Sequence, residues 1–177
     1  CEEPRAEEGW IQMEPSIGPM LNGRYCYQVD LSSGQDAQNN NFGNFKLGII
    51  QSRKYEDLND DSTRDSGEPY LNDWTIRLYK QGEGWQLVDT KVTGHTGTLG
   101  QYRFENLGLG TYYICEVLQA GWTQTDPRAP EGFANQSGAS DEASRCRRFI
   151  MNQSGAESIG QKHFGNIHYG SIPCRYP

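Results

Sequence analysis

Short runs that alternate between apolar and polar residues, separated by glycine-rich turns, recur through the middle of the chain. Residues 74–79 alternate with a period of two, residues 81–84 supply a Gly-rich turn, and residues 85–88 form a second strand-like run. This arrangement predicts a β-hairpin. Further strand-like runs stand at 101–104 and 111–117, and no segment has a convincing helical period. Short strands spaced about ten residues apart predict an all-β sandwich.

The chain also repeats itself, because residues 1–44 resemble residues 115–166. Both segments contain a Cys-Glu pair, a heptapeptide that begins Gly-Trp and ends in proline, a second cysteine and a Phe-Gly-Asn tripeptide, in that order. The matched landmarks are Cys1-Glu2 with Cys115-Glu116, 9–15 with 121–127, Cys26 with Cys146, and 42–44 with 164–166. Chance does not place four landmarks in register. We therefore predict a complete module at 46–168, preceded by the C-terminal half of a second module at 1–45 and followed by a tail at 169–177.

The repeat also predicts how the five cysteines pair. Their spacings fit neither a Cys-x-x-Cys redox pair nor a zinc site. Each matched segment carries its own pair, which predicts disulfides from Cys1 to Cys26 and from Cys115 to Cys146 and leaves Cys174 over. Disulfides indicate an oxidising, extracellular or cell-surface location. An alternative is that Cys1 is a lipidated N-terminal cysteine, but its match to Cys115 argues against lipidation.

Composition narrows the classes of function. The net charge is −7 and basic residues are not clustered, which argues against a nucleic-acid partner. No run of 18 apolar residues predicts a membrane span, and with no signal peptide ahead of Cys1 the chain is interpreted as a mature product. The three histidines are scattered and no nucleophile–base arrangement stands out. We therefore expect a protein that is not an enzyme.

Residues 57–68 have the spacing of a calcium-binding loop. Oxygen ligands stand at loop positions 1, 3, 5, 7, 9 and 12, the seventh being a backbone carbonyl: Asp57, Asn59, Asp61, Thr63, Asp65 and Glu68. This is the ligand order of an EF-hand loop, and Ca²⁺ prefers hard oxygen ligands. Ser62 occupies position 6, where glycine is usual, and would have to adopt a positive φ. The alternative is an acidic, solvated turn without an ion.

Several of these segments together resemble a known family. The resemblance lies in 54–61, 65–69, 74–76, 100–107, 110–112, 116–117 and 121–125. They are similar to the B-type repeat of serine-aspartate-repeat surface proteins, which are relatives of the collagen-adhesin B-type, prealbumin-like domains. The resemblance implies a Greek-key, prealbumin-like or Ig-like β-sandwich with calcium in the loop 57–68. It also implies a mechanical role as a stalk or spacer in long extracellular proteins.

The same resemblance implies a candidate covalent cross-link. Some collagen-adhesin relatives form an isopeptide bond between a lysine and an asparagine, promoted by a buried glutamate. Glu116 and Asn166 stand at the matching positions, and Lys54 or Lys46 would supply the amine. Burial would keep the amine neutral and nucleophilic and the carboxyl protonated.

Half of a sandwich cannot bury its apolar face alone. We expect the tail 169–177 to donate a strand to the half-module of a neighbouring copy, which would give a head-to-tail filament with Cys174 placed for an inter-subunit bond. Two alternatives are that the chain is a fragment of a longer repeat protein and that the half-module packs on its own complete module.

Adhesion to a glycan or protein ligand is the rival function. It would use exposed tryptophans, whereas the simpler interpretation places most of them in the core: Trp10, Trp74, Trp85 and Trp122. Asn135 and Asn152 begin Asn-x-Ser sequons and are candidate glycosylation sites.

Overall fold

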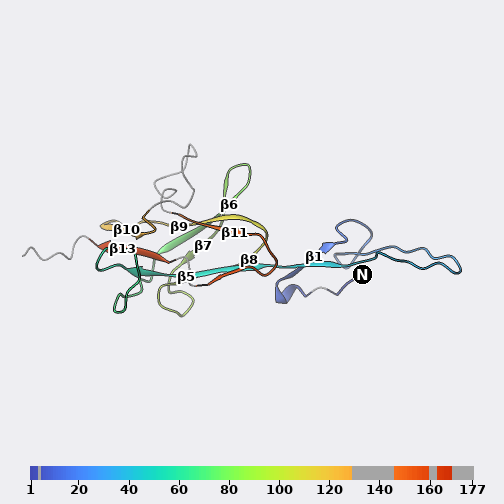
Figure 1. Ribbon diagram of the computed structural model, residues 1–177, viewed down its shortest axis with the longest axis horizontal. Coiled ribbons are helices and arrows are strands. Elements are labelled where there is room, and N and C mark those ends of the chain that lie inside the picture. Colours follow the sequence, from blue (N-terminus) through green and yellow to red (C-terminus); the bar gives the residue numbers. More distant parts are fainter. Residues whose placement is uncertain (4, 129–145, 160–162, 169–177) are drawn as a thin grey trace, which may run out of the picture.

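The computed structural model describes residues 1–3, 5–128, 146–159 and 163–168 (Figure 1). Within these residues the chain forms strands and one short 3₁₀ turn, η1 (Ala6–Glu8). The strands are β1 (Trp10–Glu14), β2 (Met20–Leu21), β3 (Arg24–Tyr25), β4 (Gly43–Lys46), β5 (Gly48–Glu56), β6 (Thr75–Gln81), β7 (Trp85–Val92), β8 (Gln101–Leu107), β9 (Gly110–Glu116), β10 (Trp122–Asp126), β11 (Arg147–Met151), β12 (Glu157–Ile159) and β13 (Phe164–His168).

Strands β5 to β13 form two facing sheets. One sheet has the order β10-β13-β5-β12 with β8 also paired to β5, and the other has the order β11-β9-β6-β7. The core between them is aliphatic and aromatic: Ile50, Ile76, Leu78, Tyr102, Phe104, Leu107, Tyr112, Ile114, Met151, Ala156 and Phe164. The predicted hairpin is the β6–β7 pair. These features confirm the all-β, Greek-key sandwich that the sequence predicts.

The period-two pattern decides which side chains enter the core. Ile76 and Leu78 of β6 alternate with half-buried polar neighbours, as a strand with one buried face requires. On β5 the inward positions after Gly48 are Ile50, Ser52 and Lys54, and all three are buried. A lysine on the inward face of a strand is unusual, because burying an ammonium group costs free energy unless it is paired.

Both disulfides that the repeat predicts are present. Cys1 is bonded to Cys26 across 25 residues, and Cys115 is bonded to Cys146 across 31 residues. The second bridge joins β9 to the start of β11 and is buried beside Tyr113. On the chain-entropy account, closing loops of this length contributes about 3 kcal/mol each.

Residues 1–47 form an arm that extends from one end of the sandwich, so that the molecule is elongated (Figure 1). In the arm β1 pairs with β4, and β4 continues through Leu47 into β5. Ser154 and Gly155 fix the junction, since the Lys46 N–H donates to Ser154 Oγ at 2.7 Å and the Gly155 N–H donates to the Lys46 carbonyl at 2.7 Å.

The predictions about glycosylation, strand donation and the inter-subunit bond involve residues that the structure does not describe. Asn135, the tail 169–177 and Cys174 lie outside the described residues. Asn152 is exposed, directly after β11. Among the described residues, no helix is both long and apolar enough to cross a bilayer.

Candidate functional site

A lysine, a glutamate and an asparagine meet inside the sandwich. The Lys54 Nζ lies 2.8 Å from Glu116 Oε2 and donates a hydrogen bond to Asn166 Oδ1. The exposed fractions of the three residues are 0%, 1% and 0%. The Lys54 ammonium also lies 4.3 Å from the centre of the Trp74 ring, which forms one wall of the site.

The sheet topology explains why these three residues meet. β5 and β13 are parallel neighbours, with Lys54 opposite Phe164 and Glu56 opposite Asn166. Lys54 is therefore two residues along β5 from the residue that faces Asn166. Glu116 ends β9 in the opposite sheet and reaches the amine across the core. Of the two candidate amines, the structure brings Lys54 to Asn166; Lys46 is exposed at the end of β4, in the arm.

Burial changes the chemistry of the amine. Desolvation lowers the pKa of Lys54 to about 8, although the charge of Glu116 and its hydrogen bond oppose the shift. About a tenth of the amines are then neutral at pH 7, compared with far fewer for an exposed lysine. The Asn166 Nδ2 is buried and has no hydrogen-bond partner among the described residues. The site therefore holds a partly neutral amine against an amide carbonyl, with a carboxyl group beside the amine.

The predicted calcium loop connects β5 to β6 and is closed by its first and last acids. Asp57 is buried, and its Oδ1 and Oδ2 accept the N–H groups of Asp61 at 3.2 Å and Ser62 at 2.9 Å. The Glu68 Oε1 and Oε2 accept the N–H groups of Leu58 at 2.7 Å and Asp65 at 2.9 Å. The two ends of the loop are thus held together by carboxylates.

Ser62 has the backbone conformation that position 6 demands. Its φ is +67°, in the left-handed region that glycine usually occupies. Its hydroxyl donates to the Thr125 carbonyl at 2.7 Å, which ties the loop to β10. Burial raises the pKa of Asp57. Hydrogen bonds from Thr125 and from the N–H groups of Ser62, Asp61 and Asp60 together lower the pKa by a larger amount, so that the net pKa is below its usual value.

The donor set of the loop suits a hard cation, although its side chains are arranged around internal hydrogen bonds. Among the described residues, no group of three or more His, Cys, Asp or Glu side chains is placed to hold a metal ion. The Asn59 Nδ2 donates to Asp61 Oδ2 at 3.1 Å and to Asp65 Oδ2 at 3.0 Å. A polar N–H group thus lies between two carboxylates, in the kind of position that a cation takes. Turning the Asn59 amide would present its oxygen instead.

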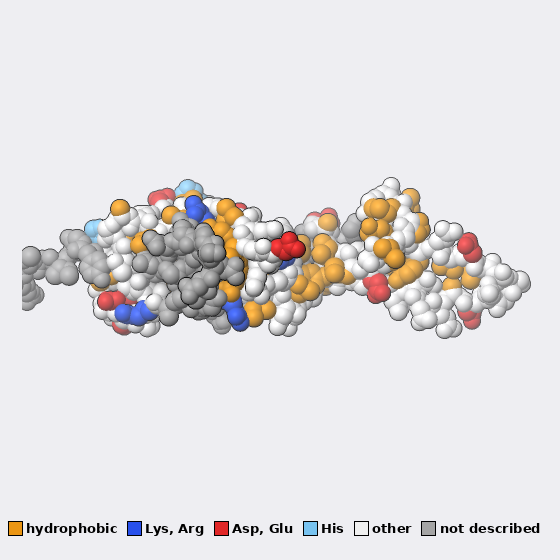
Figure 2. Space-filling view, turned by 90° about the horizontal axis from the view of Figure 1, so that it is seen from above, with side chains coloured by type: hydrophobic (Ala, Val, Ile, Leu, Met, Phe, Trp, Pro, Cys, Tyr) orange, Lys and Arg blue, Asp and Glu red, His pale blue; other side chains and the backbone are white. Residues whose placement is uncertain are grey.

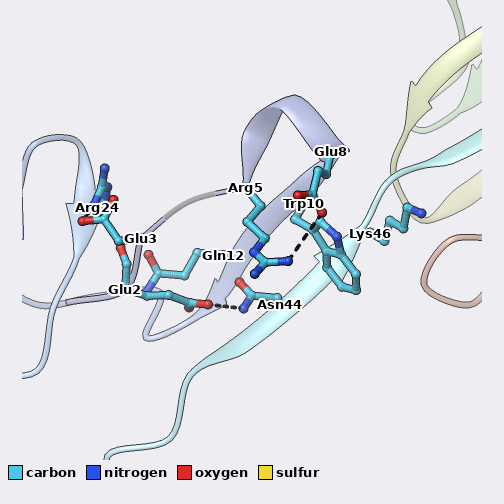
Figure 3. Close-up of a pocket in the computed structure, with 9 residues that line it drawn as sticks. All are labelled: Glu2, Glu3, Arg5, Glu8, Trp10, Gln12, Arg24, Asn44 and Lys46. Carbon is cyan, nitrogen blue, oxygen red and sulfur yellow. Dashed lines mark hydrogen bonds and ion pairs between the residues drawn. The ribbon is translucent and has the colours of Figure 1, made fainter.

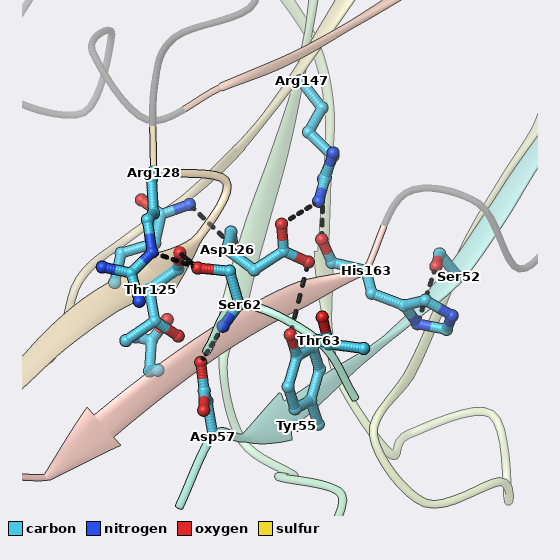
Figure 4. A network of polar contacts seen from close by, with 12 residues as sticks. Ser52, Tyr55, Asp57, Ser62, Thr63, Thr125, Asp126, Arg128, Arg147 and His163 are labelled. Atoms are coloured by element: carbon cyan, nitrogen blue, oxygen red, sulfur yellow. Dashed lines mark hydrogen bonds and ion pairs between the residues drawn. The ribbon is translucent and has the colours of Figure 1, made fainter. Parts of the chain in front are cut away.

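A second polar network lies under this loop, at the end of β10 (Figure 4). Asp126 accepts hydrogen bonds from Arg147 of β11 and, at 3.4 Å, from the Tyr55 hydroxyl. Burial raises the pKa of Asp126, and the neighbouring Arg147 opposes that shift. Arg128 contacts Ser62 and Asp60 from the other side. The network was not predicted; the acid before proline that occurs in both repeats, Glu14 and Asp126, was the available signal.

The tryptophans of the sandwich mostly serve packing. Trp74 is buried and packs edge-to-face on Trp122, with ring centres 5.5 Å apart. Trp85 packs edge-to-face on Tyr113 at 4.3 Å. Trp10, in the arm, is half-buried and lines a cavity.

Comparisons with known proteins identify the family. The family model of the SdrD B-like domain matches residues 49–161, which is well over half of the chain. The "Bone sialoprotein-binding protein" of Staphylococcus aureus is 34% identical over 82 residues, which are 46% of this chain and 7% of that protein. The chain therefore spans only a small part of this relative.

Several solved structures also match part of the chain. The Bacillus anthracis TIE protein has a TM-score of 0.41 at 15% identity over 67% of this chain and 17% of its own. The shaft pilin spaA of Lactobacillus rhamnosus GG has a TM-score of 0.41 at 12% identity, covering 70% of this chain and 51% of the pilin. GBS52, the minor pilin of Streptococcus agalactiae, has a TM-score of 0.39 at 12% identity, with coverages of 74% and 49%. On the match over residues 49–161, the chain belongs to the SdrD B-like domain family.

Proposed function

We propose that this chain is a non-catalytic structural module of an extracellular stalk or filament, stiffened by an internal Lys54–Asn166 isopeptide bond, by its disulfides and by Ca²⁺. The observation that carries the proposal is the buried contact of Lys54 with both Glu116 and Asn166. Membership of the SdrD B-like family and the two disulfides support an extracellular, structural role.

The bond forms by amide exchange and needs no outside reagent. The neutral Lys54 Nζ attacks the Asn166 Cγ, the C–N bond to Nδ2 breaks, and the nitrogen leaves as ammonia. The carboxyl group of Glu116 takes the proton lost by the attacking amine and returns one to the leaving nitrogen. One amide replaces another, and the chain becomes lighter by about 17 Da, the mass of the ammonia released.

The position of this bond suits a stalk. Load that enters along the arm reaches the sandwich through β4 and β5, and load that leaves at the C-terminal end passes through β13. Lys54 and Asn166 lie on these two strands, which are parallel neighbours. A covalent bond between them carries the force directly, so the remaining strands of the sandwich stay unloaded.

Single-molecule pulling tests this role. Stretched from Cys1 to His168, the native chain should not extend between Lys54 and Asn166. The Asn166→Ala variant should release that segment except for the 31-residue loop closed by the Cys115–Cys146 bridge, a gain of roughly 280 Å at about 3.5 Å per residue. Asn152→Ala, a change at an exposed position, is the control. Equal extension of the native chain and Asn166→Ala would reject the proposed stalk role.

Calcium is the second stiffening element of the proposal. The ligands would be the side chains of Asp57, Asn59, Asp61, Asp65 and Glu68 with the Thr63 carbonyl. The ion would neutralise the carboxylates crowded into this loop and fix it against β10. A calcium concentration 100-fold above the dissociation constant should stabilise the fold by about 2.7 kcal/mol.

Thermal unfolding with calcium and with EGTA checks this expectation. The melting temperature should fall on chelation, and Glu68→Gln should remove most of the difference because Glu68 would supply the last ligand. Glu83→Gln, in the exposed β6–β7 turn, is the matched control and should keep the full response. An identical melting temperature in calcium and in EGTA would reject a calcium site here.

Polymerisation by strand donation and binding of a ligand are two further functions considered for this chain. Strand donation by residues 169–177 involves a segment outside the described residues, so head-to-tail assembly stays a prediction. Ligand binding of the kind named for the Staphylococcus aureus relative is the second candidate. Trp74, one of the four tryptophans considered for it, is buried.

A further inference from the structure

The arm repeats the geometry of the last two strands of the sandwich. Gln12 of β1 is opposite Asn44 of β4, just as Gln124 of β10 is opposite Asn166 of β13, and both pairs have a register shift directly after the glutamine. Glu2 follows Cys1 as Glu116 follows Cys115, and each cysteine is in a disulfide. Glu2 and Asn44 therefore hold the positions of the glutamate and the asparagine of the buried triad.

The structure also brings these two side chains together. The Asn44 Nδ2 donates to Glu2 Oε1 at 2.5 Å, although the residues are 42 positions apart in the chain (Figure 3). They border a cavity of about 450 Å³ that Trp10 also lines. The counterpart of Trp10 is Trp122, which packs against Trp74 in the sandwich. The cavity thus lies on the side of the arm that β5 and the Trp74 segment cover in the complete module.

Residues that are buried in the sandwich are open in the arm. Phe164 is 0% exposed, whereas its counterpart Phe42 is 40% exposed. A Cβ on Gly165 would lie 2.6 Å from the Tyr55 ring of β5, whereas a Cβ on Gly43 would meet only Glu14 of the arm itself. Among the described residues, β4 pairs with β1 alone, whereas β13 pairs with both β10 and β5.

Apolar side chains on the arm are exposed as a group. They are Ile11, Met13, Ile17, Met20, Leu21, Val29, Leu31 and Phe42. Figure 2 shows hydrophobic side chains gathered midway along this arm, between the sandwich and the far tip of the arm. Exposed apolar surface of this extent indicates an interaction surface. The repeat specifies the shape of the partner, because Phe164, the counterpart of Phe42, packs in the sandwich core against side chains from residues 48–114 such as Ile50 and Tyr102.

We propose that residues 1–47 receive the N-terminal half of another module of this kind and form an isopeptide bond from its lysine to Asn44. The partner is a segment like residues 48–114: its first strand lies parallel to β4, and its lysine, opposite Phe42, lies beside Glu2 and Asn44. The exchange is the one described for Lys54 and Asn166, with loss of ammonia. The proposal rests on the proposed function, since it requires the same reaction.

A tandem chain tests this directly. A copy of residues 48–114 is joined ahead of Cys1 of the full chain, so that each module contains a lysine, a glutamate and an asparagine. Electrospray mass of the denatured protein should show a second loss of about 17 Da beyond that of the Lys54–Asn166 bond. Tandem mass spectrometry should find the appended lysine joined to Asn44. Asn44→Ala should abolish the second loss only, and Asn41→Ala, at an exposed neighbouring position, should not.

The first and second mass losses separate the two claims. Absence of the first loss counts against the proposed function. A normal first loss without a second one, together with no adduct at Asn44 in the peptide mixture described next, overturns the covalent bond to Asn44. This holds even if the appended segment protects the arm from cleavage by trypsin after Arg5 and Arg24. If trypsin also still cleaves after Arg5 and Arg24, the arm does not bind the appended segment at all.

A second experiment does not depend on correct folding of the tandem chain. A synthetic peptide of residues 48–58 is added in excess to the unextended chain, and an adduct at Asn44 that disappears with a Lys54→Ala peptide supports the proposal. Failure to detect a bond to Asn44 in both the tandem chain and the peptide mixture overturns it.

Discussion

Replacing Glu116 with alanine is expected to lower the free energy of unfolding of the sandwich by about 3–5 kcal/mol or more. The change leaves the fully buried amine of Lys54 without the carboxylate that lies 2.8 Å from it. It also removes the proton carrier from the isopeptide reaction, so the variant should lack the cross-link between β5 and β13. Chemical denaturation followed by tryptophan fluorescence, with the mass of the same sample, measures both effects.

Glu105→Ala is the matched control for this change. Glu105 also pairs with a basic side chain, Arg103, at 2.7 Å, but its side chain is 54% exposed. An exposed pair of this kind contributes about 0–1 kcal/mol. Similar losses of stability in Glu116→Ala and Glu105→Ala would contradict the role assigned to the buried triad.

The second large effect is expected from removing the Cys115–Cys146 bridge. Changing both cysteines to alanine should destabilise the sandwich by about 2–5 kcal/mol. The bridge closes a 31-residue loop and holds β9, which carries Glu116, beside β11. The melting temperature of the double variant should therefore fall, and isopeptide formation should become slower because Glu116 is less firmly placed.

The paired change Cys1→Ala and Cys26→Ala tests whether this effect is local. That bridge lies in the arm and joins residue 1 to the end of β3. Its removal should leave the main unfolding transition of the sandwich within about 1 kcal/mol of the native value, because independent sites add with little coupling. If the arm bridge affected the main transition as much as the sandwich bridge does, the two modules would not be energetically separate.

The strands were predictable because local alternation of residues determines them, and the disulfides were predictable because the repeat pairs their cysteines. The alternation at 74–79 and the turn at 81–84 predict the β6–β7 hairpin, and the structure has that hairpin. The pairing of four cysteines followed from the repeat, because each repeat supplies its own pair. The family resemblance drawn from the same residues is confirmed by the match over residues 49–161.

The amine of the triad could not be chosen from the sequence alone. Lys46 and Lys54 stand on successive strands, and only the parallel register of β5 with β13 shows that Lys54 is the one beside Asn166. The strand pattern gives no warning that Lys54 points inward, since Ser52 and Lys54 would ordinarily be assigned to a solvent face. Parallel pairing between the first and last strands of a module is a long-range property that periodicity does not encode.

In the loop 57–68 and in the arm, the sequence predicts local features but not which side chains come into contact. The spacing at 57–68 correctly anticipates a positive φ at Ser62, a local property. Whether the oxygens converge on an ion depends on side-chain orientation, which spacing leaves open. In the arm, the repeat identifies Glu2 and Asn44 as counterparts of Glu116 and Asn166, but only the folded chain shows the contact between them.

The mass of the native chain under denaturing conditions tests the central claim most directly. With both disulfides intact, the account predicts a mass about 17 Da below that calculated from the sequence with its bridges, because one ammonia has left. A tryptic digest should contain one branched peptide that joins Lys54 to Asn166. A mass equal to the calculated value, with Lys54 and Asn166 recovered in separate unmodified peptides, would contradict the account.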